Sequence, residues 1–345
     1  MTGLLLRRIG GIVMINKAYQ GLYNGESAIW LQADRYEAVM LPGRGGNLIA
    51  FRDTKRNFHF LREPSQEEMD TVFKTKPYVF GIPVLFPPNR FDGGHFTWDG
   101  MQYNFPVNEL ELGNHLHGFL YDVPWGVEAF GADECESYVT VSLTVGDNHP
   151  VFQYFPHQFT IRLRYSLTEN GLSQHVMILN NGEKLMPCML AFHTTLNAPF
   201  SQGGSADDYR FKVTIGDRWE LTNRFLPTGN FQPLTKHETQ MGNEGVYPFY
   251  GSMDNHYTAQ SQNGSNRMEL TDHKECVTLI YDVSTAYRQW MIWNNEATPG
   301  FLCPEPQTNL INAPNVELSD EQTGVIALKP KQIWEASSRL YTVES

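Results

Sequence analysis

The chain has 345 residues, of which 41% are hydrophobic and 19% are charged, so it can form a large core and is too apolar to be mainly disordered. Its formal net charge of −12 argues against nucleic acids and anionic membranes as partners. The four scattered cysteines form no CxxC pair, and neither a secretory signal nor a bilayer-spanning run is evident, so we expect a soluble, cytoplasmic protein with reduced, mostly buried thiols.

Strand patterns occur along the whole chain, whereas helix signals are few. Ser65 followed by Gln-Glu-Glu is typical of a helix start and predicts a short helix reaching about Lys74. Residues 96–103 predict a hairpin that turns at an Asp-Gly pair. Residues 138–145 alternate between apolar and small polar side chains, and residues 159–179 predict a second hairpin with Asn-Gly at its turn. Further strands are predicted at residues 211–215, 276–283, 289–293, 324–328 and 332–343.

Three long segments between these strands are predicted to be loops, at residues 197–210, 221–250 and 304–319. Long ordered loops on a β scaffold usually cover a sheet edge or build a site. The chain contains no βαβ pattern, no GxGxxG or P-loop motif and no obvious linker. We therefore expect one domain over residues 1–345, all-β in class, built as a large antiparallel β-sandwich or supersandwich with few short helices.

Two stretches in the first third of the chain place polar residues beside prolines and glycines. Residues 81–90 read Gly-Ile-Pro-Val-Leu-Phe-Pro-Pro-Asn-Arg, and an arginine held by such a rigid run can fork onto a carboxylate or sugar hydroxyls. The alternative for Arg90 is a surface position after a turn. Residues 113–118 read Gly-Asn-His-Leu-His-Gly. In a strand, His115 and His117 would face one space, which suits metal ligation, substrate binding, or one functional histidine beside a structural one.

Three further candidates lie later in the chain. His193 ends an apolar strand, where a side chain can point from a rigid frame into a cleft, although it could equally be a core histidine. Glu305 lies between two prolines after an apolar strand, and partial burial there would raise its pKa towards that of a useful base. The alternative for Glu305 is a solvated turn residue. Asp254, late in a glycine-rich loop region, is a weaker candidate with turn capping as its ordinary role.

In kind and order along the chain, these stretches resemble the aldose 1-epimerase (galactose mutarotase-like) superfamily. The order is Asn-Arg, Leu-His-Gly, a strand-end His followed by Asn, Asp-x-His, and a C-terminal strand with Glu. The resemblance implies a β-supersandwich and an isomerase of carbohydrate metabolism that interconverts the anomers of a free sugar. It implies no cofactor and no metal, and a small sugar as the partner, while leaving open whether the protein is a monomer or a homodimer.

The resemblance also implies roles for individual residues. Glu305 would be the general base that takes the proton from the anomeric hydroxyl, and His193 the general acid that protonates the ring oxygen. The side chains expected to bind or position the sugar are those of Asn89, Arg90, His115, His117, Asp254 and Gln307, with the role of His115 the least defined. An acid and a base at opposite ends of one hemiacetal are what ring opening and reclosure require.

The sequence departs from better-known galactose mutarotases in ways that leave the preferred sugar open. Phe119 follows Leu-His-Gly where a further glycine is common, no aromatic lies between His193 and Asn197, and Glu305 is framed as Pro-Glu-Pro-Gln. A hexose 6-phosphate mutarotase is one alternative, and it would need extra cations near the cleft, for which Arg44, Arg52, Arg56 and Arg62 are the candidates. A non-catalytic sugar-binding protein and a metal-dependent cupin-type enzyme that uses the His-x-His pair are the others.

Overall fold

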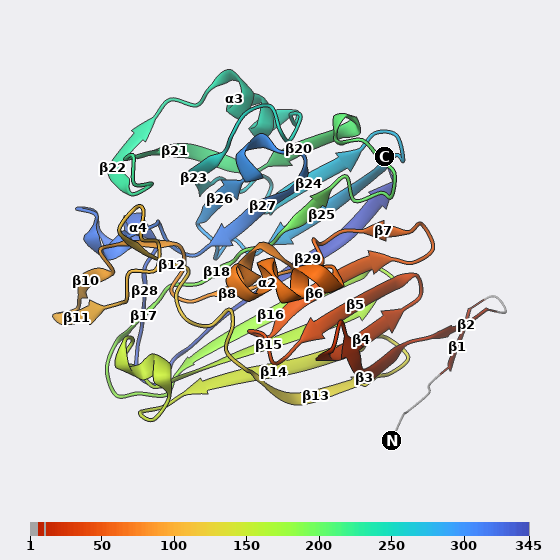
Figure 1. Ribbon diagram of the computed structural model, residues 1–345, viewed down its shortest axis with the longest axis horizontal. Helices are drawn as coiled ribbons and strands as arrows, with labels where there is room; N and C mark the ends of the chain where they lie inside the picture. The colour runs from red at the N-terminus through yellow and green to blue at the C-terminus, as the bar shows by residue number, and fades with distance from the viewer. Residues whose placement is uncertain (1–5, 10–11, 345) are drawn as a thin grey trace.

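The computed structural model describes residues 6–9 and 12–344, with side chains from residue 16 onward, and consists mainly of antiparallel β-sheets (Figure 1). The first large sheet has the strand order β13-β14-β15-β16-β29-β25-β24-β20. Its strands are β13 (Gly126–Ala132), β14 (Ser137–Val145), β15 (Phe159–Thr168), β16 (Gly171–Asn180), β29 (Ile333–Glu344), β25 (Val277–Val283), β24 (Asn266–Asp272) and β20 (Tyr209–Val213).

The second large sheet has the order β22-β21-β23-β26-β27-β18-β8, with β19 paired to β27 beside this path. Its strands are β22 (Pro227–Gln232), β21 (Ile215–Leu221), β23 (Asp254–Ala259), β26 (Gln289–Trp293), β27 (Gly300–Gln307), β18 (Ala191–Phe192), β8 (Val84–Leu85) and β19 (Leu196–Ala198). A five-stranded sheet contains β3 (Lys17–Tyr23), β4 (Glu26–Ala33), β5 (Tyr36–Leu41), β6 (Asn47–Asp53) and β7 (Phe58–His59).

Smaller elements complete the described chain. The two-stranded pairings join β1 (Leu6–Ile9) with β2 (Ile12–Ile15), β9 (Arg90–Asp92) with β12 (Asn114–Leu116), β10 (His95–Trp98) with β11 (Met101–Asn104), and β17 (Met186–Cys188) with β28 (Ile326–Leu328). The α-helices are α1 (Gln66–Asp70), α2 (Val72–Thr75), α3 (Lys236–Asn243) and α4 (Asp320–Thr323), and the 3-10 helices are η1 (Pro77–Val79), η2 (Pro150–Gln153), η3 (Ala206–Asp208), η4 (Asn295–Ala297) and η5 (Ala313–Asn315). None of these helices is long and apolar enough to cross a bilayer.

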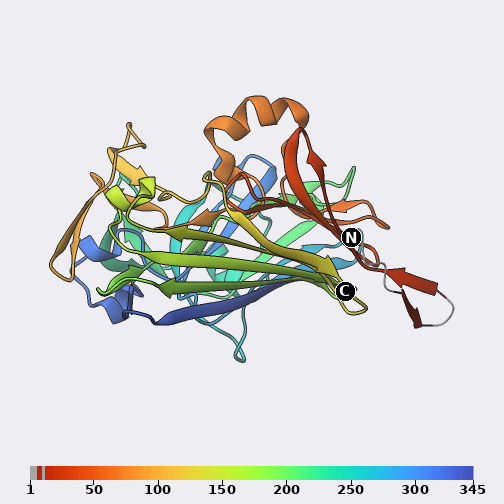
Figure 2. The same cartoon turned by 90° about the horizontal axis from the view of Figure 1, so that it is seen from below.

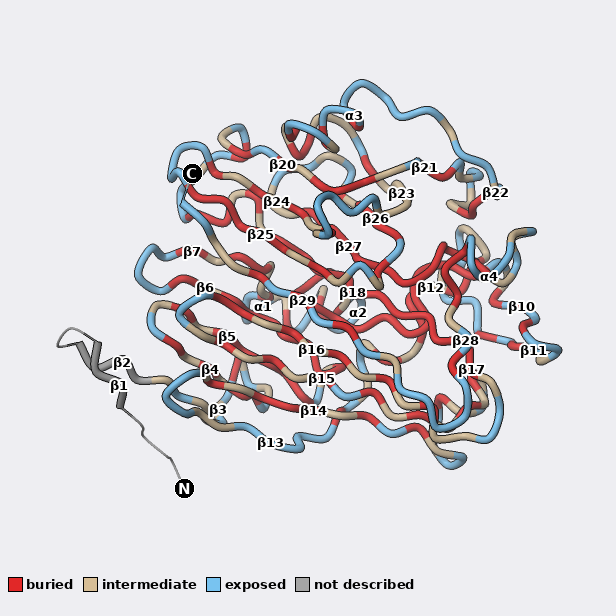
Figure 3. The backbone as a smooth tube through the Cα atoms, turned by 180° about the vertical axis from the view of Figure 1, so that it is seen from behind, coloured by how far each residue is buried: buried red, intermediate tan, exposed pale blue. Residues whose placement is uncertain are grey.

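The sheets stack over a large core, to which buried side chains from Ile29 to Leu340 contribute, and a smaller core lies between the five-stranded sheet and helices α1 and α2. Seen from below, the five-stranded sheet lies against the β13–β16 half of the first large sheet (Figure 2). Burial alternates along β15 and β16, because successive side chains of a strand point to opposite faces. Buried backbone therefore runs through the sheet centres, and exposed backbone is concentrated at turns and edges (Figure 3).

The predicted all-β class, the few short helices and the two hairpins are confirmed. The predicted hairpin at 159–179 is β15–β16, and that at 96–103 is β10–β11. Ser65 forms a capping box with Glu68, as its sequence context suggested, but the helix is interrupted at Thr71, whose φ of −120° and ψ of −89° are not helical. The thiols are free, as expected, yet only two of the four are buried.

Two of the expected loops were predicted wrongly. Residues 221–250 contain strand β22 and helix α3, and the helix begins with a capping box of Thr235 and Glu238 that could have been recognised in the sequence. Residues 304–307 are not the start of a loop but the last part of β27, so Glu305 lies within a strand. The flanking prolines have no N–H to donate, and β27 still pairs with β26 there. They are tolerated because the pairing of β27 on its other side is interrupted between β19 and β18.

Candidate functional site

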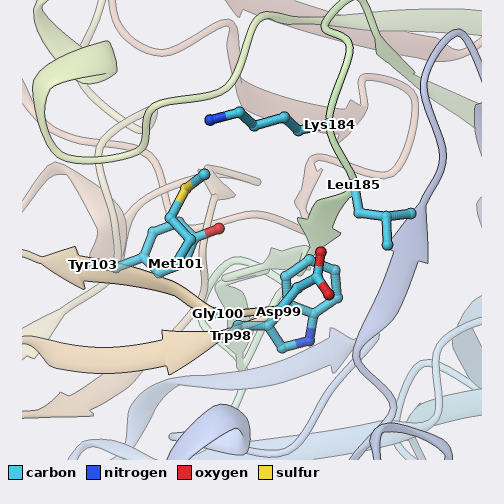
Figure 4. A pocket seen from close by; sticks show the side chains of 7 residues that line it. All are labelled: Trp98, Asp99, Gly100, Met101, Tyr103, Lys184 and Leu185. Carbon is cyan, nitrogen blue, oxygen red and sulfur yellow. The ribbon is translucent and has the colours of Figure 1, made fainter.

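A cavity of about 360 Å³ opens where the ends of β23, β26 and β27 meet the segments after β8, β12 and β18. It is lined by six of the eight residues expected in the site, namely Asn89, Arg90, His117, His193, Asp254 and Glu305. A larger hollow of about 440 Å³ at the β10–β11 hairpin contains none of them (Figure 4). Its wall is formed by Trp98, Asp99, Gly100, Met101, Tyr103, Lys184 and Leu185. We therefore take the smaller cavity as the candidate site.

His193 and Glu305 form a buried pair in this cavity. The Nε2 atom of His193 lies 3.3 Å from Oε1 of Glu305, and the two side chains are only 4% and 2% exposed. His193 directly follows β18, and its backbone N–H donates a hydrogen bond to the carbonyl of Pro83. Glu305 points from the part of β27 that has no partner strand on the β18 side. The interruption of pairing thus creates the space in which the two side chains meet.

The electrostatics of the pair favour its uncharged form. Burial raises the pKa of Glu305 well above its usual range, the nearby Asp254 carboxylate acts in the same direction, and the Arg90 guanidinium opposes both. Burial lowers the pKa of His193 to about 4. Burial thus disfavours charge on both partners, and the 3.3 Å contact lets a proton pass from one to the other.

Arg90, the first residue of β9, is held between two carboxylates of the cavity. Its Nε lies 3.0 Å from Oε1 of Glu109, and its Nη2 lies 3.3 Å from Oδ2 of Asp254. The guanidinium also lies over the ring of Phe225, 4.8 Å from its centroid. Burial raises the pKa of Asp254 and the arginine counteracts this. Because its guanidinium is already bonded to two carboxylates, Arg90 holds the wall of the cavity together.

Asn89 and His117 are joined through their backbones at the cavity wall. Both have a positive φ, of 57° and 69°, and the N–H of His117 donates to the carbonyl of Asn89 at 2.9 Å. Gly118 comes next with φ of 66°, where a Cβ would lie 2.4 Å from the carbonyl oxygen of Phe86. Only glycine fits at that position, so the His-Gly pair turns the chain sharply and directs His117 into the cavity.

The expectation that His115 and His117 face one space is wrong. His115 belongs to β12, whereas His117 has already left the strand and follows a left-handed backbone. The Nδ1–H of His115 donates to the carbonyl of Pro106 at 2.7 Å, and its ring packs on Phe105 and Phe119. His115 is therefore outside the cavity lining. Among residues 16–344, no group of three or more His, Cys, Asp or Glu side chains is arranged to hold a metal ion.

Gln307, the other expected site residue that does not line the cavity, lies behind Glu305. Its Nε2 donates a long hydrogen bond of 3.4 Å to Oε2 of Glu305, and the side chain is fully buried. The structure thus places Gln307 where it can orient the carboxylate. Contact between Gln307 and a sugar stays a prediction.

Several lining residues were missed by the sequence reasoning. Tyr78 packs 4.5 Å from the ring of His117, and burial raises its pKa to about 12, so it stays protonated. Trp293, at the end of a strand that was predicted, contacts His193 edge to face. The other lining residues that the prediction missed are Lys76, Val79, Glu109, Glu111, Leu116, Met291 and Glu296. Because they come from segments scattered along the chain, no local pattern marks them as neighbours.

The loose basic stretch considered for phosphate binding does not line the cavity. Arg44 pairs with Glu26 and Asp122, and Arg52 pairs with Glu37 and Glu63. Arg56 and Arg62 are likewise bound to carboxylates, those of Glu344 and Glu68. These four arginines therefore serve structural ion pairs.

Comparison with known proteins finds matches to a protein family, to curated sequences and to solved structures. A family model for aldose 1-epimerase matches residues 27–341. Among curated relatives, the uncharacterized protein YihR of Escherichia coli K12 is 23% identical over 207 residues (59% of this chain and 60% of YihR). A probable aldose 1-epimerase of Arthroderma benhamiae is 28% identical over 212 residues (57% of this chain, 44% of the relative). The matches thus span less than two thirds of either relative's length.

Solved structures resemble nearly the whole chain. A galactose mutarotase-like protein from Clostridium acetobutylicum superposes with a TM-score of 0.91 and 30% sequence identity, covering 96% of this chain and 99% of the other. A galactose 1-epimerase from Lactobacillus acidophilus superposes with a TM-score of 0.68 at 15% identity, covering 100% of this chain and 99% of the other. At that identity the second likeness concerns the fold alone.

Proposed function

Because this chain belongs to the aldose 1-epimerase family and has the galactose mutarotase-like fold, we propose that it is a mutarotase, which interconverts the α and β anomers of a free aldose. The observation that carries the proposal is the buried contact between His193 and Glu305 at the bottom of a sugar-sized cavity. An isomerase that opens and closes a hemiacetal needs one proton donor and one proton acceptor held close together. A pair that shares one proton supplies both.

In the proposed reaction, Glu305 and His193 act on the two oxygens bonded to the anomeric carbon. With the shared proton on His193, Glu305 takes the proton of the C1 hydroxyl while the Nε2–H of His193 protonates the ring oxygen. The bond from C1 to the ring oxygen breaks, and a C1 carbonyl forms. Rotation about C1–C2 presents the other carbonyl face, and the reverse proton transfers close the ring as the other anomer. Neither step changes the oxidation state of the sugar.

The remaining lining residues are suited to holding the sugar. Asp254 and the neutral imidazole of His117 can hydrogen-bond to hydroxyls, and Asn89 and Arg90 keep these groups in place. Tyr78 and Trp293 offer aromatic surface for the apolar face of a pyranose ring. A protein that only binds sugar has no need for a buried proton-sharing pair, which favours catalysis over binding alone.

The proposal is tested by polarimetry on freshly dissolved α-glucose and α-galactose, with and without protein, in buffer low in phosphate. Glu305→Gln and His193→Asn should each lower kcat by about 10²- to 10⁴-fold, because each removes one partner of the proton transfer. His175 and Glu335 provide a matched control, since this surface histidine–glutamate pair is 3.5 Å apart and far more exposed.

Substitution of the surface pair in the same way, as His175→Asn and Glu335→Gln, should leave kcat within about twofold, because exposed ion pairs contribute little. Near-wild-type rates in the Glu305 or His193 variant would overturn the mechanism. Tight sugar binding without any acceleration of mutarotation would instead identify a sugar-binding protein.

A further inference from the structure

The exposed part of the cavity lining is predominantly acidic. Of the lining residues, only Lys76, Glu111 and Glu296 are exposed, so they surround the entrance. Within residues 16–344, neither Glu111 nor Glu296 forms an ion pair or a side-chain hydrogen bond. We call these two residues the acidic rim.

Deeper in the cavity, positive charge is already neutralised. Arg90 is bonded to both Glu109 and Asp254, so these three groups together carry an excess of negative charge. Lys76 is the one lining cation in the described residues that is not committed to a carboxylate. Four carboxylates thus face two cations, even when Glu305, whose charged form is disfavoured by burial, is left out of the count. An anionic group that enters would meet net negative charge.

Glu296 is held at the entrance by an unusual turn. Asn295, Glu296 and Ala297 have φ values of 52°, 55° and 62°, a left-handed run that is unfavourable for residues other than glycine. The fully buried Asn294 fixes the turn, since its Oδ1 accepts from the N–H groups of Met253 and Ala297. Its Nδ2 donates to the carbonyls of two residues in the segment before Asp254. The side chain of Asn294 thus holds in place both the turn that carries Glu296 and the segment that leads into Asp254.

A second feature shows what kind of ligand the cavity is built to receive. The imidazole of His117 is 6% exposed and lines the cavity, yet neither of its ring nitrogens has a hydrogen-bond partner among the described residues, and Nδ1 is fully buried. Burial lowers the pKa of His117 well below its usual value, so the ring is neutral. A neutral imidazole can hydrogen-bond to a hydroxyl but adds no positive charge for a phosphate.

We propose that the acidic rim of Glu111 and Glu296 sets the substrate class, so that uncharged and ammonium-bearing sugars are accepted and sugars carrying a phosphate or carboxylate are disfavoured. The inference rests on the proposed mutarotase function. Repulsion between the rim and an anionic substituent lowers kcat/KM through binding, whereas attraction favours an ammonium group. Lys76 acts against the rim, and its removal makes the discrimination stronger.

The test compares glucose, glucosamine and glucose 6-phosphate at a pH where the amine is protonated, with spontaneous mutarotation subtracted. In the wild-type protein, kcat/KM for glucose 6-phosphate should be at least about tenfold below that for glucose. The double variant Glu111→Gln/Glu296→Gln should raise the ratio of phosphate sugar to glucose by about tenfold and lower the ratio of glucosamine to glucose. Lys76→Met should change both ratios in the opposite direction. Added salt should reduce the wild-type differences, because charges at an open entrance are screened.

A wild-type preference for glucose 6-phosphate, or unchanged ratios in the double variant, would overturn this inference even if glucose is turned over normally. Calorimetry measures the equilibrium affinities of the same three sugars. The ratios of these affinities report the same discrimination without catalysis. Binding that follows the predicted order without turnover would support the acidic rim while the mutarotase function fails. The two proposals therefore fail separately.

Discussion

The imidazole of His117 shows how one residue can be made ready for a ligand at a cost to the empty protein. Its buried Nδ1 lacks a hydrogen-bond partner in the described residues, a situation that costs about 1–3 kcal/mol for a buried polar group. The left-handed backbone at His117 and the adjoining Gly118 turn the chain so that the ring lines the cavity. The same sharp turn separates it from His115, whose Nδ1–H donates to the carbonyl of Pro106 and whose Nε2 is itself buried without a partner among the described residues. Two histidines of one motif thus have different roles.

We expect His117→Asn to raise KM for the preferred sugar by about three- to tenfold, the equivalent of one hydrogen bond, with a smaller effect on kcat. Initial rates by polarimetry over a range of sugar concentrations measure both constants. The exposed His95, on β10 outside the cavity, provides the control as His95→Asn. A KM equal to that of the wild-type protein would argue against substrate contact by His117.

Three neighbouring strands bring the polar side chains of the site to one end of the second large sheet. β23, β26 and β27 lie side by side (Figure 1). In their pairing, Asp254 lies opposite Trp293 and Met291 lies opposite Glu305. The turn after β26 carries Glu296, and the interruption between β18 and β19 admits His193. The turn stores strain, while Asn294 supplies the hydrogen bonds that maintain it.

Asn294→Ala should destabilise the protein by about 2–4 kcal/mol, because it leaves several buried backbone groups without partners. Glu296→Gly should instead increase the free energy of unfolding by up to about 1 kcal/mol, since glycine tolerates the left-handed backbone. Urea unfolding monitored by tryptophan fluorescence compares both with the wild-type protein. A neutral Asn294→Ala variant would show that the turn does not need this side chain, and a destabilised Glu296→Gly variant would show that it is not strained.

Several histidines are buried in the core and in the cavity of the molecule. Burial lowers the pKa of His115, His157 and His193 to about 4, and that of His256 to about 3. In the unfolded chain these groups have ordinary pKa values near about 6.5 and take up protons that the folded protein does not. Their contribution to stability is therefore present above pH 6.5 and is lost as the pH falls. Glu305 acts in the opposite sense, because its raised pKa favours the folded state at low pH.

We accordingly expect the free energy of unfolding to fall between pH 6.5 and pH 5, with each of these histidines contributing up to about 1.4 kcal/mol per pH unit. The buried histidines with lowered pKa values, His117 included, outnumber the carboxyls with raised pKa values, which are those of Glu305, Asp254 and Asp122. Urea unfolding at pH 7.5, 6.5, 5.5 and 5.0 gives the slope. Replacement of His157, which lies outside the cavity, by asparagine should reduce the slope. Stability that is constant or that rises on acidification would contradict the expectation.

The sequence by itself determined the features that depend on neighbours along the chain. Alternation of apolar and polar residues predicted the strands of both hairpins, Asn-Gly and Asp-Gly pairs predicted their turns, and Ser65 predicted a helix start. The order of short motifs predicted the family and six residues that line one cavity. Such features are encoded locally, because backbone preferences and side-chain period act over a few residues.

Only the tertiary structure decided which side chains meet and how they are charged. Arg90 and Asp254 form an ion pair although they are 164 residues apart, and Glu305 reaches His193 where the pairing of β27 is interrupted. Lys76, Glu111 and Glu296 become neighbours of the site solely through folding. Desolvation and long-range contacts shift the pKa values and set the charge of the cavity, and both effects arise only when the chain has packed.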